Sequence, residues 1–210
     1  FRDKKFKEFI ESNNWTLLVI DEEEHRDLID KFGVRAFPTL AVFNSEEEEI
    51  DRMTGARGIE KFLEFFEFCK TSEDTFYSLK NEYEGGNVCE DVVVKLMLKY
   101  DDRNDKKNVD KFMKIVMEKY PDAPELKVYD AVKNIKTERE KSLEVIGKYI
   151  YFMDADSELF ENAVNIYFYD LKKKKAWEQM KDAIDDFDQG QSTDRLFNYY
   201  YEALFNMVEV

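Results

Sequence analysis

The chain of 210 residues carries 32 basic and 47 acidic side chains, so its formal net charge is −15. This charge argues against nucleic acid as a partner, because phosphate binding depends on clustered lysine and arginine. Hydrophobic residues make up 43% of the chain, which is enough for one and a half to two folded domains, and no apolar run is long enough to span a bilayer.

Strand and helix signals alternate over the first part of the chain. Trp15–Asp21 is an apolar, β-branched run of strand length, and Glu22–Phe32 is predicted as a helix that ends at Gly33. Pro38 then precedes an apolar run that ends at Phe43. Because proline has no N–H to give a sheet, Pro38 indicates a strand start or a cis turn.

A hairpin and a helix are predicted next. The polar residues Asn44–Glu47 are typical of a turn, and Glu49–Met53 is predicted as an edge strand. The glutamates at 46–49 lack the spaced ligands and glycine of a calcium loop, so we interpret them as a charged turn that protects a sheet edge. Thr54–Gly58 then leads into a helix over Ile59–Lys70, whose apolar residues repeat at helical spacing: Ile59, Phe62, Leu63 and Phe66.

This order of elements, with Val34–Thr39 before a strand and Met53–Ala56 before an amphipathic helix, resembles the C-terminal two-thirds of a thioredoxin domain. The resemblance covers residues 1–70 and implies an α/β fold with an incomplete sheet. The helix Phe1–Ile10 is similar to the one that follows the active-site cysteines in bacterial thioredoxin-like proteins.

The resemblance also implies a binding site. Pro38 would be the cis-proline beside the redox centre, Phe37 would offer its backbone to an extended substrate chain, and Gly55 would mark the turn after the edge strand. The expected substrate-binding residues are therefore Phe37, Pro38, Thr39 and Gly55.

The chain departs from this family in one respect: it contains no Cys-x-x-Cys, which in the family lies before the position of Phe1. In the family, the strand that leads to those cysteines lies between the strands matching Trp15–Asp21 and Ala41–Phe43. Without it, both would carry unpaired backbone groups. We therefore expect residues upstream of Phe1 in the natural protein; a partner chain or a rearranged sheet is the alternative.

The remaining reactive side chains form no motif. Cys69 and Cys89 match no zinc or redox spacing and are expected to be ordinary small apolar residues. His25 alone makes neither a metal site nor a catalytic triad. The basic run Lys172–Lys175 is interpreted as a solvated helix junction rather than a site for an acidic partner. We expect no catalytic residue, metal or cofactor in this chain.

After Lys70 the strand signals disappear, and we predict an all-α domain over residues 71–210, made of antiparallel helical hairpins. Breaks between its helices are expected at Glu84–Asn87, Asp101–Asp105, Tyr120–Pro124, Asn134–Thr137, Asp154–Asp156 and Asp188–Gly190.

A faint repeat suggests that these hairpins are similar to tetratricopeptide repeats. Val93, Leu126 and Leu159 recur every 33 residues, each near the start of a helix pair. The small-residue positions are eroded, with Met97 and Val109 where glycine or alanine is usual. The prediction is therefore a TPR-like domain, which would offer a concave face to an extended or helical peptide.

The aromatic run Leu196–Phe205 at the C-terminal end is expected to be a helix docked on the last pair. If it is exposed instead, it should dimerise.

Two functions remain from the sequence. The first is a thioredoxin-like thiol-disulfide oxidoreductase whose cysteines lie upstream, with a helical domain that recruits a protein or peptide client. The second is a redox-inactive thioredoxin-like binding or scaffold protein that keeps the groove beside Pro38. The residues leave the compartment open, and the resemblance favours the bacterial periplasm or another extracytoplasmic site, because export from bacterial cells is common among proteins that resemble the first 70 residues.

Overall fold

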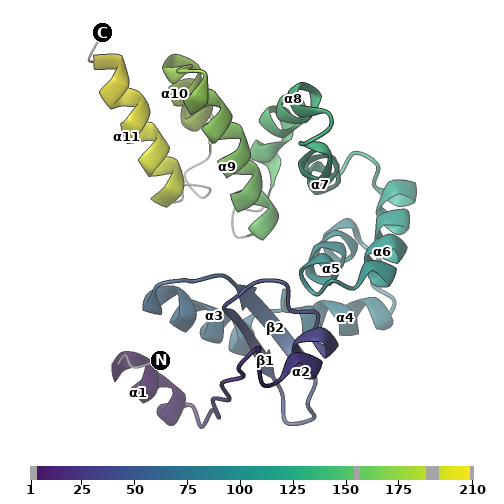
Figure 1. The fold of residues 1–210 in the computed structure, drawn as a ribbon. Helices are drawn as coiled ribbons and strands as arrows, with labels where there is room; N and C mark the ends of the chain where they lie inside the picture. Colours follow the sequence, from purple (N-terminus) through teal and green to yellow (C-terminus); the bar gives the residue numbers. More distant parts are fainter. Residues whose placement is uncertain (1–3, 154–156, 188–193, 209–210) are drawn as a thin grey trace. The chain divides into compact units, whose positions relative to one another are not determined.

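The computed structural model describes residues 4–153, 157–187 and 194–208. The chain forms two compact units, residues 1–115 and 116–210, and the division falls inside helix α6 (Lys106–Lys119) (Figure 1). The breaks expected at Asp154–Asp156 and Asp188–Gly190 lie outside the described residues.

The first unit combines a small sheet with helices. Its β-strands are antiparallel, with Thr39 opposite Thr54 and an irregularity between Val42 and Phe43. In the turn between them, the Asn44 side-chain oxygen accepts hydrogen bonds from two backbone amides, which explains why this polar cluster forms a hairpin. The elements are α1 (Lys4–Ser12), α2 (Arg26–Lys31), β1 (Thr39–Phe43), β2 (Glu49–Thr54), α3 (Ile59–Thr71), α4 (Phe76–Glu84) and α5 (Glu90–Asp102).

The strand predicted over Trp15–Asp21 is wrong, because this segment has no regular secondary structure. A strand must pair its backbone groups with a neighbour, and among the described residues the sheet holds only β1 and β2. Leu18 and Val19 are accordingly 76% and 68% exposed. The helix predicted over Glu22–Phe32 is also shorter, since residues 22–24 form a turn before α2.

One apolar cluster of the first unit lies between α1, α3 and the sheet, and further apolar residues are buried in α4 to α6. Phe6, Val42, Phe66 and Cys69 are buried together, and the ring of Trp15 packs edge-on against Phe66 at 4.9 Å between centroids. The helix predicted over Ile59–Lys70 is confirmed as α3, and Cys69 is the small buried residue that the sequence indicated. This core supports β1 from one side.

Helices α4 and α5 pack against each other, and α4 also contacts β2. The Thr75 hydroxyl caps α4 by accepting a hydrogen bond from the Ser78 amide at 3.2 Å. The predicted breaks near residues 85 and 103 are confirmed, and Cys89 is an exposed residue just before α5. Residues from the predicted helical region therefore lie directly against the sheet.

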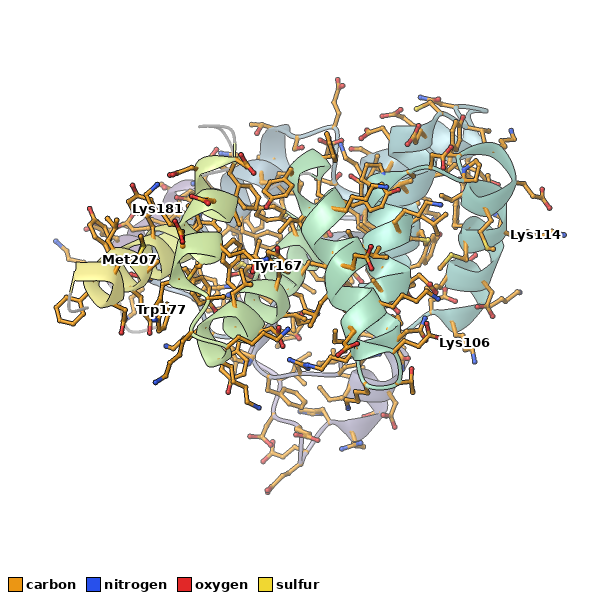
Figure 2. All side chains as sticks on the ribbon, turned by 90° about the horizontal axis from the view of Figure 1, so that it is seen from above. Lys106, Lys114, Tyr167, Trp177, Lys181 and Met207 are labelled. Carbon is orange, nitrogen blue, oxygen red and sulfur yellow. The ribbon has the colours of Figure 1, made fainter. Side chains whose placement is uncertain are left out.

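The second unit is helical throughout its described residues (Figure 2). Helices α7 and α8 pack against each other, α9 contacts both of them, and α10 contacts α9 and α11. At one close approach, a Cβ atom added to Gly147 of α8 would lie 2.7 Å from the ring of Tyr167 on α9. The elements after α6 are α7 (Pro124–Asn134), α8 (Arg139–Tyr149), the 3₁₀ turn η1 (Ile150–Phe152), α9 (Glu158–Lys173), α10 (Trp177–Asp185) and α11 (Asp194–Val208).

The predicted breaks at Tyr120–Pro124 and Asn134–Thr137 are confirmed by the ends of α6 to α8, whereas the TPR-like arrangement stays a prediction. The basic run Lys172–Lys175 spans the end of α9 and is exposed, as a helix junction should be. None of the helices built from described residues combines the length and apolar character needed to cross a bilayer.

Candidate functional site

The loop between α2 and β1 carries two of the four residues expected to bind substrate, Phe37 and Pro38, and leads directly into a third, Thr39. It begins at Gly33, which adopts a left-handed backbone conformation with φ of +61°. The Gly33 amide donates to the Asp30 carbonyl at 3.2 Å and the Val34 amide donates to the Ile29 carbonyl at 3.0 Å. Glycine therefore ends α2 here, as the sequence predicted.

The four expected residues lie close together. The Phe37–Pro38 peptide bond is cis, and the Pro38 carbonyl accepts a hydrogen bond from the Gly55 amide at 2.8 Å. The Thr39 hydroxyl donates to the Ala36 carbonyl at 2.8 Å, and Thr39 is also the first residue of β1. Phe37 is 52% exposed. The result is a turn at the end of the hairpin that is held by hydrogen bonds of Pro38 and Thr39, here called the braced turn. The side chain of Phe37 in this turn is open to solvent.

A buried network of charged residues lies behind this loop. Arg52 donates to the Phe32 carbonyl at 2.7 Å and forms two hydrogen bonds with the Glu49 carboxylate, at 2.7 and 2.6 Å. Glu49 also pairs with Arg103 at the end of α5, at 2.7 Å. Glu49 is thus a largely buried residue of β2 that bridges two arginines, which corrects its interpretation as part of a charged turn that protects a sheet edge.

Asp51 is the second acidic member of the network and is almost fully buried. It pairs with Arg103 at 3.1 Å, pairs with Lys99, and accepts a hydrogen bond from the Phe76 amide at 3.2 Å. The Arg103 guanidinium also stacks on the Phe76 ring at 3.7 Å. Sequence analysis missed this network, and its only signal was an aspartate within a predicted strand.

Neither cysteine of the chain belongs to a Cys-x-x-Cys pair, and the properties of the two thiols differ. Burial, reinforced by the nearby negative charge of Asp51, raises the pKa of the Cys69 thiol to about 12. This thiol is therefore neutral at physiological pH and a poor nucleophile. Cys89 is exposed and free. Within the described ranges, no three His, Cys, Asp or Glu side chains are arranged to hold a metal ion.

Comparisons with known proteins agree with this geometry. Residues 3–68 match the Thioredoxin family model. The chain is 36% identical over 64 residues to protein disulfide isomerase-like 2-2 of Oryza sativa subsp. japonica, an alignment covering 30% of this chain and 17% of that protein. It is 41% identical over 54 residues to protein disulfide-isomerase tigA of Aspergillus niger, covering 26% and 15%.

The chain thus spans less than a fifth of the length of either relative. No solved structure matches it significantly. What the comparisons add is confined to the first third of the chain, where the loop, the hairpin and α3 lie.

Proposed function

Since residues 3–68 form a thioredoxin domain with relatives among the disulfide isomerases, we propose that the protein is a thioredoxin-like thiol-disulfide oxidoreductase. Its two redox cysteines would lie upstream of residue 1, and clients would bind at Phe37, Pro38, Thr39 and Gly55. The observation that carries the proposal is the braced turn itself, in which Gly55 holds the Pro38 carbonyl while Phe37 stays exposed.

The proposed reaction is thiol-disulfide exchange. The first upstream cysteine, as thiolate, attacks a client disulfide, forms a mixed disulfide and releases one client sulfur as a thiolate that takes a proton. The second cysteine then attacks the enzyme sulfur of the mixed disulfide. The client leaves reduced and the enzyme keeps a disulfide, so two electrons pass to the client; the same steps in reverse oxidise a client.

Two exposed features support a missing upstream strand. Among the described residues β1 pairs only with β2, so its other edge has no strand partner. The apolar segment 15–21 also exposes Leu18 and Val19. A strand supplied by upstream residues would pair with β1 and cover this segment, and it would bring the cysteines that follow it toward Pro38.

Client binding would use the backbone as well as side chains. An extended peptide can add to an exposed backbone edge, with main-chain hydrogen bonds giving affinity and side-chain contacts giving selectivity. Phe37 would supply the apolar contact. This mode requires no particular client sequence, which suits an enzyme that acts on unfolded chains.

The test is to extend the chain to its natural start and measure the reduction of a quenched, disulfide-linked reporter peptide. We expect reduction that is lost when the first upstream cysteine is changed to serine. The variant Phe37→Ala should weaken binding of an alkylated peptide, whereas Phe152→Ala, another exposed phenylalanine, should not. An upstream strand without paired cysteines would contradict the enzyme.

The second candidate is a redox-inactive thioredoxin-like binding or scaffold protein, and the state of Cys69 and Cys89 is compatible with it. The free Cys89 and the protonated Cys69 offer no redox pair within the chain. The two candidates differ only in the upstream residues. Binding of the alkylated peptide without any reporter reduction by the extended protein would establish the binding module.

The TPR-like domain over residues 71–210 is proposed to recruit clients. Limited proteolysis between Lys70 and Asn87 tests the boundary, because a separable domain should be released intact. If the released helical part retains no client, recruitment is excluded. The bacterial and periplasmic expectation also stays a prediction.

Dimerisation through α11 is a further proposal. Leu196 and Ala203 are buried, so this helix docks on its unit as expected, but Tyr201 and Phe205 remain 66% and 65% exposed. Sedimentation of the wild-type protein and of Phe205→Lys tests it. A monomer at all concentrations would contradict a dimer.

A further inference from the structure

We propose that the C-terminal end of α5, together with Asn104, positions the loop of residues 33–38 and thereby sets the affinity of the client site. This inference rests on the proposed function, since the loop carries Phe37 and Pro38. Residues that the sequence assigned to a separate helical domain would then be positioning residues of the thioredoxin-like site. Three contacts carry the argument.

The first contact is between backbones. A Cβ atom added to Gly33 would lie 2.0 Å from the carbonyl oxygen of Arg103, far inside van der Waals contact. Only glycine allows this approach, and Gly33 also has the positive φ that glycine adopts without strain. The start of the loop therefore lies directly on the last turn of α5.

The second contact is between side chains. The Arg35 guanidinium donates a hydrogen bond to the Asn104 side-chain oxygen and lies 4.0 Å from the Asp101 carboxylate. The backbone of Asn104 is held in place, because its backbone amide donates a hydrogen bond to the Asp101 carbonyl at 2.9 Å. This residue has a left-handed backbone conformation with φ of +57°. Arg35 precedes Phe37 by two residues, so this contact holds the loop next to the exposed ring.

The third contact is a chain of buried ion pairs and hydrogen bonds from Arg103 to the residue before the loop. Arg103 pairs with Glu49 at 2.7 Å, Glu49 accepts from Arg52, and Arg52 donates to the Phe32 carbonyl at 2.7 Å. These side chains are buried, so the pairs are screened little by water. The end of α5 thus also holds the residue from which the loop starts.

Together these contacts restrain Phe32, Gly33 and Arg35, while Gly55 restrains Pro38 on the other side. A loop already ordered in its binding conformation loses less conformational entropy when a client binds. Releasing Arg35 from Asn104 should let the loop move and weaken binding by about 3- to 10-fold, which is the range for about one kcal/mol.

The experiment uses the chain of residues 1–210 and a fluorescein-labelled extended peptide with a central alkylated cysteine. Probe affinity is measured by anisotropy for Arg35→Ala, Asn104→Ala and the double variant. Hydrogen exchange of the loop amides is followed in the same proteins, with α3 as internal reference. Arg35 and Asn104 are exposed enough that these variants should keep the fold.

Matched controls separate positioning from general effects. Arg26→Ala removes another exposed arginine that forms ion pairs only within residues 22–30. Asn14→Ala changes another exposed asparagine with a left-handed backbone, φ of +55°, and so reports the cost of that conformation alone. Both controls should bind the probe as the wild type does.

We expect each single variant to lose about 3- to 10-fold in affinity, and the double variant to lose no more than either single, because one contact is removed in all three. Loop exchange should rise while α3 exchange stays constant. The conservative variant Asn104→Asp keeps an oxygen acceptor for Arg35. If it binds the probe more tightly than Asn104→Ala does, a merely structural effect is excluded.

Unchanged hydrogen exchange of the loop amides in both single variants would overturn the inference. It would also be overturned if Arg35→Ala and Asn104→Ala bound the probe with wild-type affinity while Phe37→Ala bound it weakly. If Phe37→Ala leaves probe binding unchanged, the proposed client site is wrong. In that case the claim that α5 sets client affinity is overturned with it, while raised loop exchange would still show that α5 holds the loop.

Discussion

The two units of the molecule are held together by different interactions. In the first unit, Asp51 and Arg103 are buried charged residues that connect β2 to α5, and they lie in a unit whose apolar residues are buried both beside the sheet and in α4 to α6. In the second unit, one cluster of 14 buried apolar residues extends through α7 to α11, and Asp170 is the buried charged residue among those described. The first unit should therefore be sensitive to the loss of a buried charge as well as to the loss of packing, whereas the second should respond mainly to the loss of packing.

Two tryptophans allow each unit to be followed separately. Trp15 packs in the first unit and Trp177 begins α10 in the second. Replacing one of them by phenylalanine leaves the other as a fluorescent reporter of a single unit. The predictions below use urea unfolding of such proteins.

The largest expected effect is that of Asp51→Ala on the first unit. The variant leaves the buried Arg103 and the partly buried Lys99 without this carboxylate, and breaking such a buried pair costs about 4 kcal/mol. The Trp15 signal should report the loss. The control Asp74→Ala removes a half-exposed carboxylate that pairs with Lys95, and it should cost less than about 1 kcal/mol. If Asp51→Ala and Asp74→Ala lower the free energy of unfolding equally, buried charge does not stabilise the first unit as proposed.

The second unit should be most sensitive to packing, as Met180→Ala tests. Met180 is fully buried in α10, and truncation of a buried methionine costs about 3 kcal/mol from lost contacts and the remaining cavity. The Trp177 signal should shift accordingly. Met117, which is exposed on α6, provides the control, since Met117→Ala should change stability by less than about 0.5 kcal/mol.

Asp170 gives the second unit a dependence on acid. Burial alone would raise the pKa of this carboxyl, but hydrogen bonds and charges from Lys174 and Arg139 outweigh burial and lower the pKa from 3.8. Because the folded pKa is lowered, the stabilisation is complete above the unfolded value and is lost as the pH falls through the folded value. Asp170→Asn should cost about 1.5 kcal/mol at pH 7 and progressively less as the pH falls toward 2.

The acid test has a clear contradiction. Unfolding of the second unit, measured with the Trp177 reporter from pH 7 to pH 2, should be flatter in Asp170→Asn than in the wild type. If the two profiles keep the same separation at every pH, the ion pairs of Asp170 do not contribute to stability.

The smallest expected effects are those of the helix caps, and here the two units should agree. The Thr75 and Ser157 side chains each accept a hydrogen bond from an amide in the first turn of α4 and α9. Replacement of a capping hydroxyl by alanine costs about 1 kcal/mol. Thr75→Ala should affect the Trp15 signal and Ser157→Ala the Trp177 signal; a clear difference in size would show that burial of Thr75 adds to its cap.

The sequence was a good guide where structure is local. A helix pairs its backbone groups within itself, so α3 and the breaks around α6 to α8 could be predicted from spacing alone. Trp15–Asp21 has the composition of a strand, but a strand depends on a neighbour that the sequence of the segment does not reveal. The wrong prediction there has this physical cause.

The candidate site shows the same division. Pro38 and Gly55 are recognisable because their special backbone properties mark turns, and their carbonyl and amide are hydrogen-bonded to each other. The pair of Asp51 with Arg103 joins residues 52 positions apart with no periodic pattern, so the sequence showed an aspartate within a predicted strand but did not indicate its partner. Glu49 was misinterpreted for the same reason, since its partner lies on a distant helix.

The exposed segment at residues 15–21 also matters for handling the protein. It combines Trp15, Leu17, Leu18, Val19 and Ile20 without a proline, and it is part of the same unit as β1, which has an unpaired edge among the described residues. Short apolar stretches of high β-propensity and bare sheet edges are the starting points of cross-β aggregation. Concentrated preparations of this chain should therefore form fibrillar aggregates through the first unit, and Leu18→Lys should delay them.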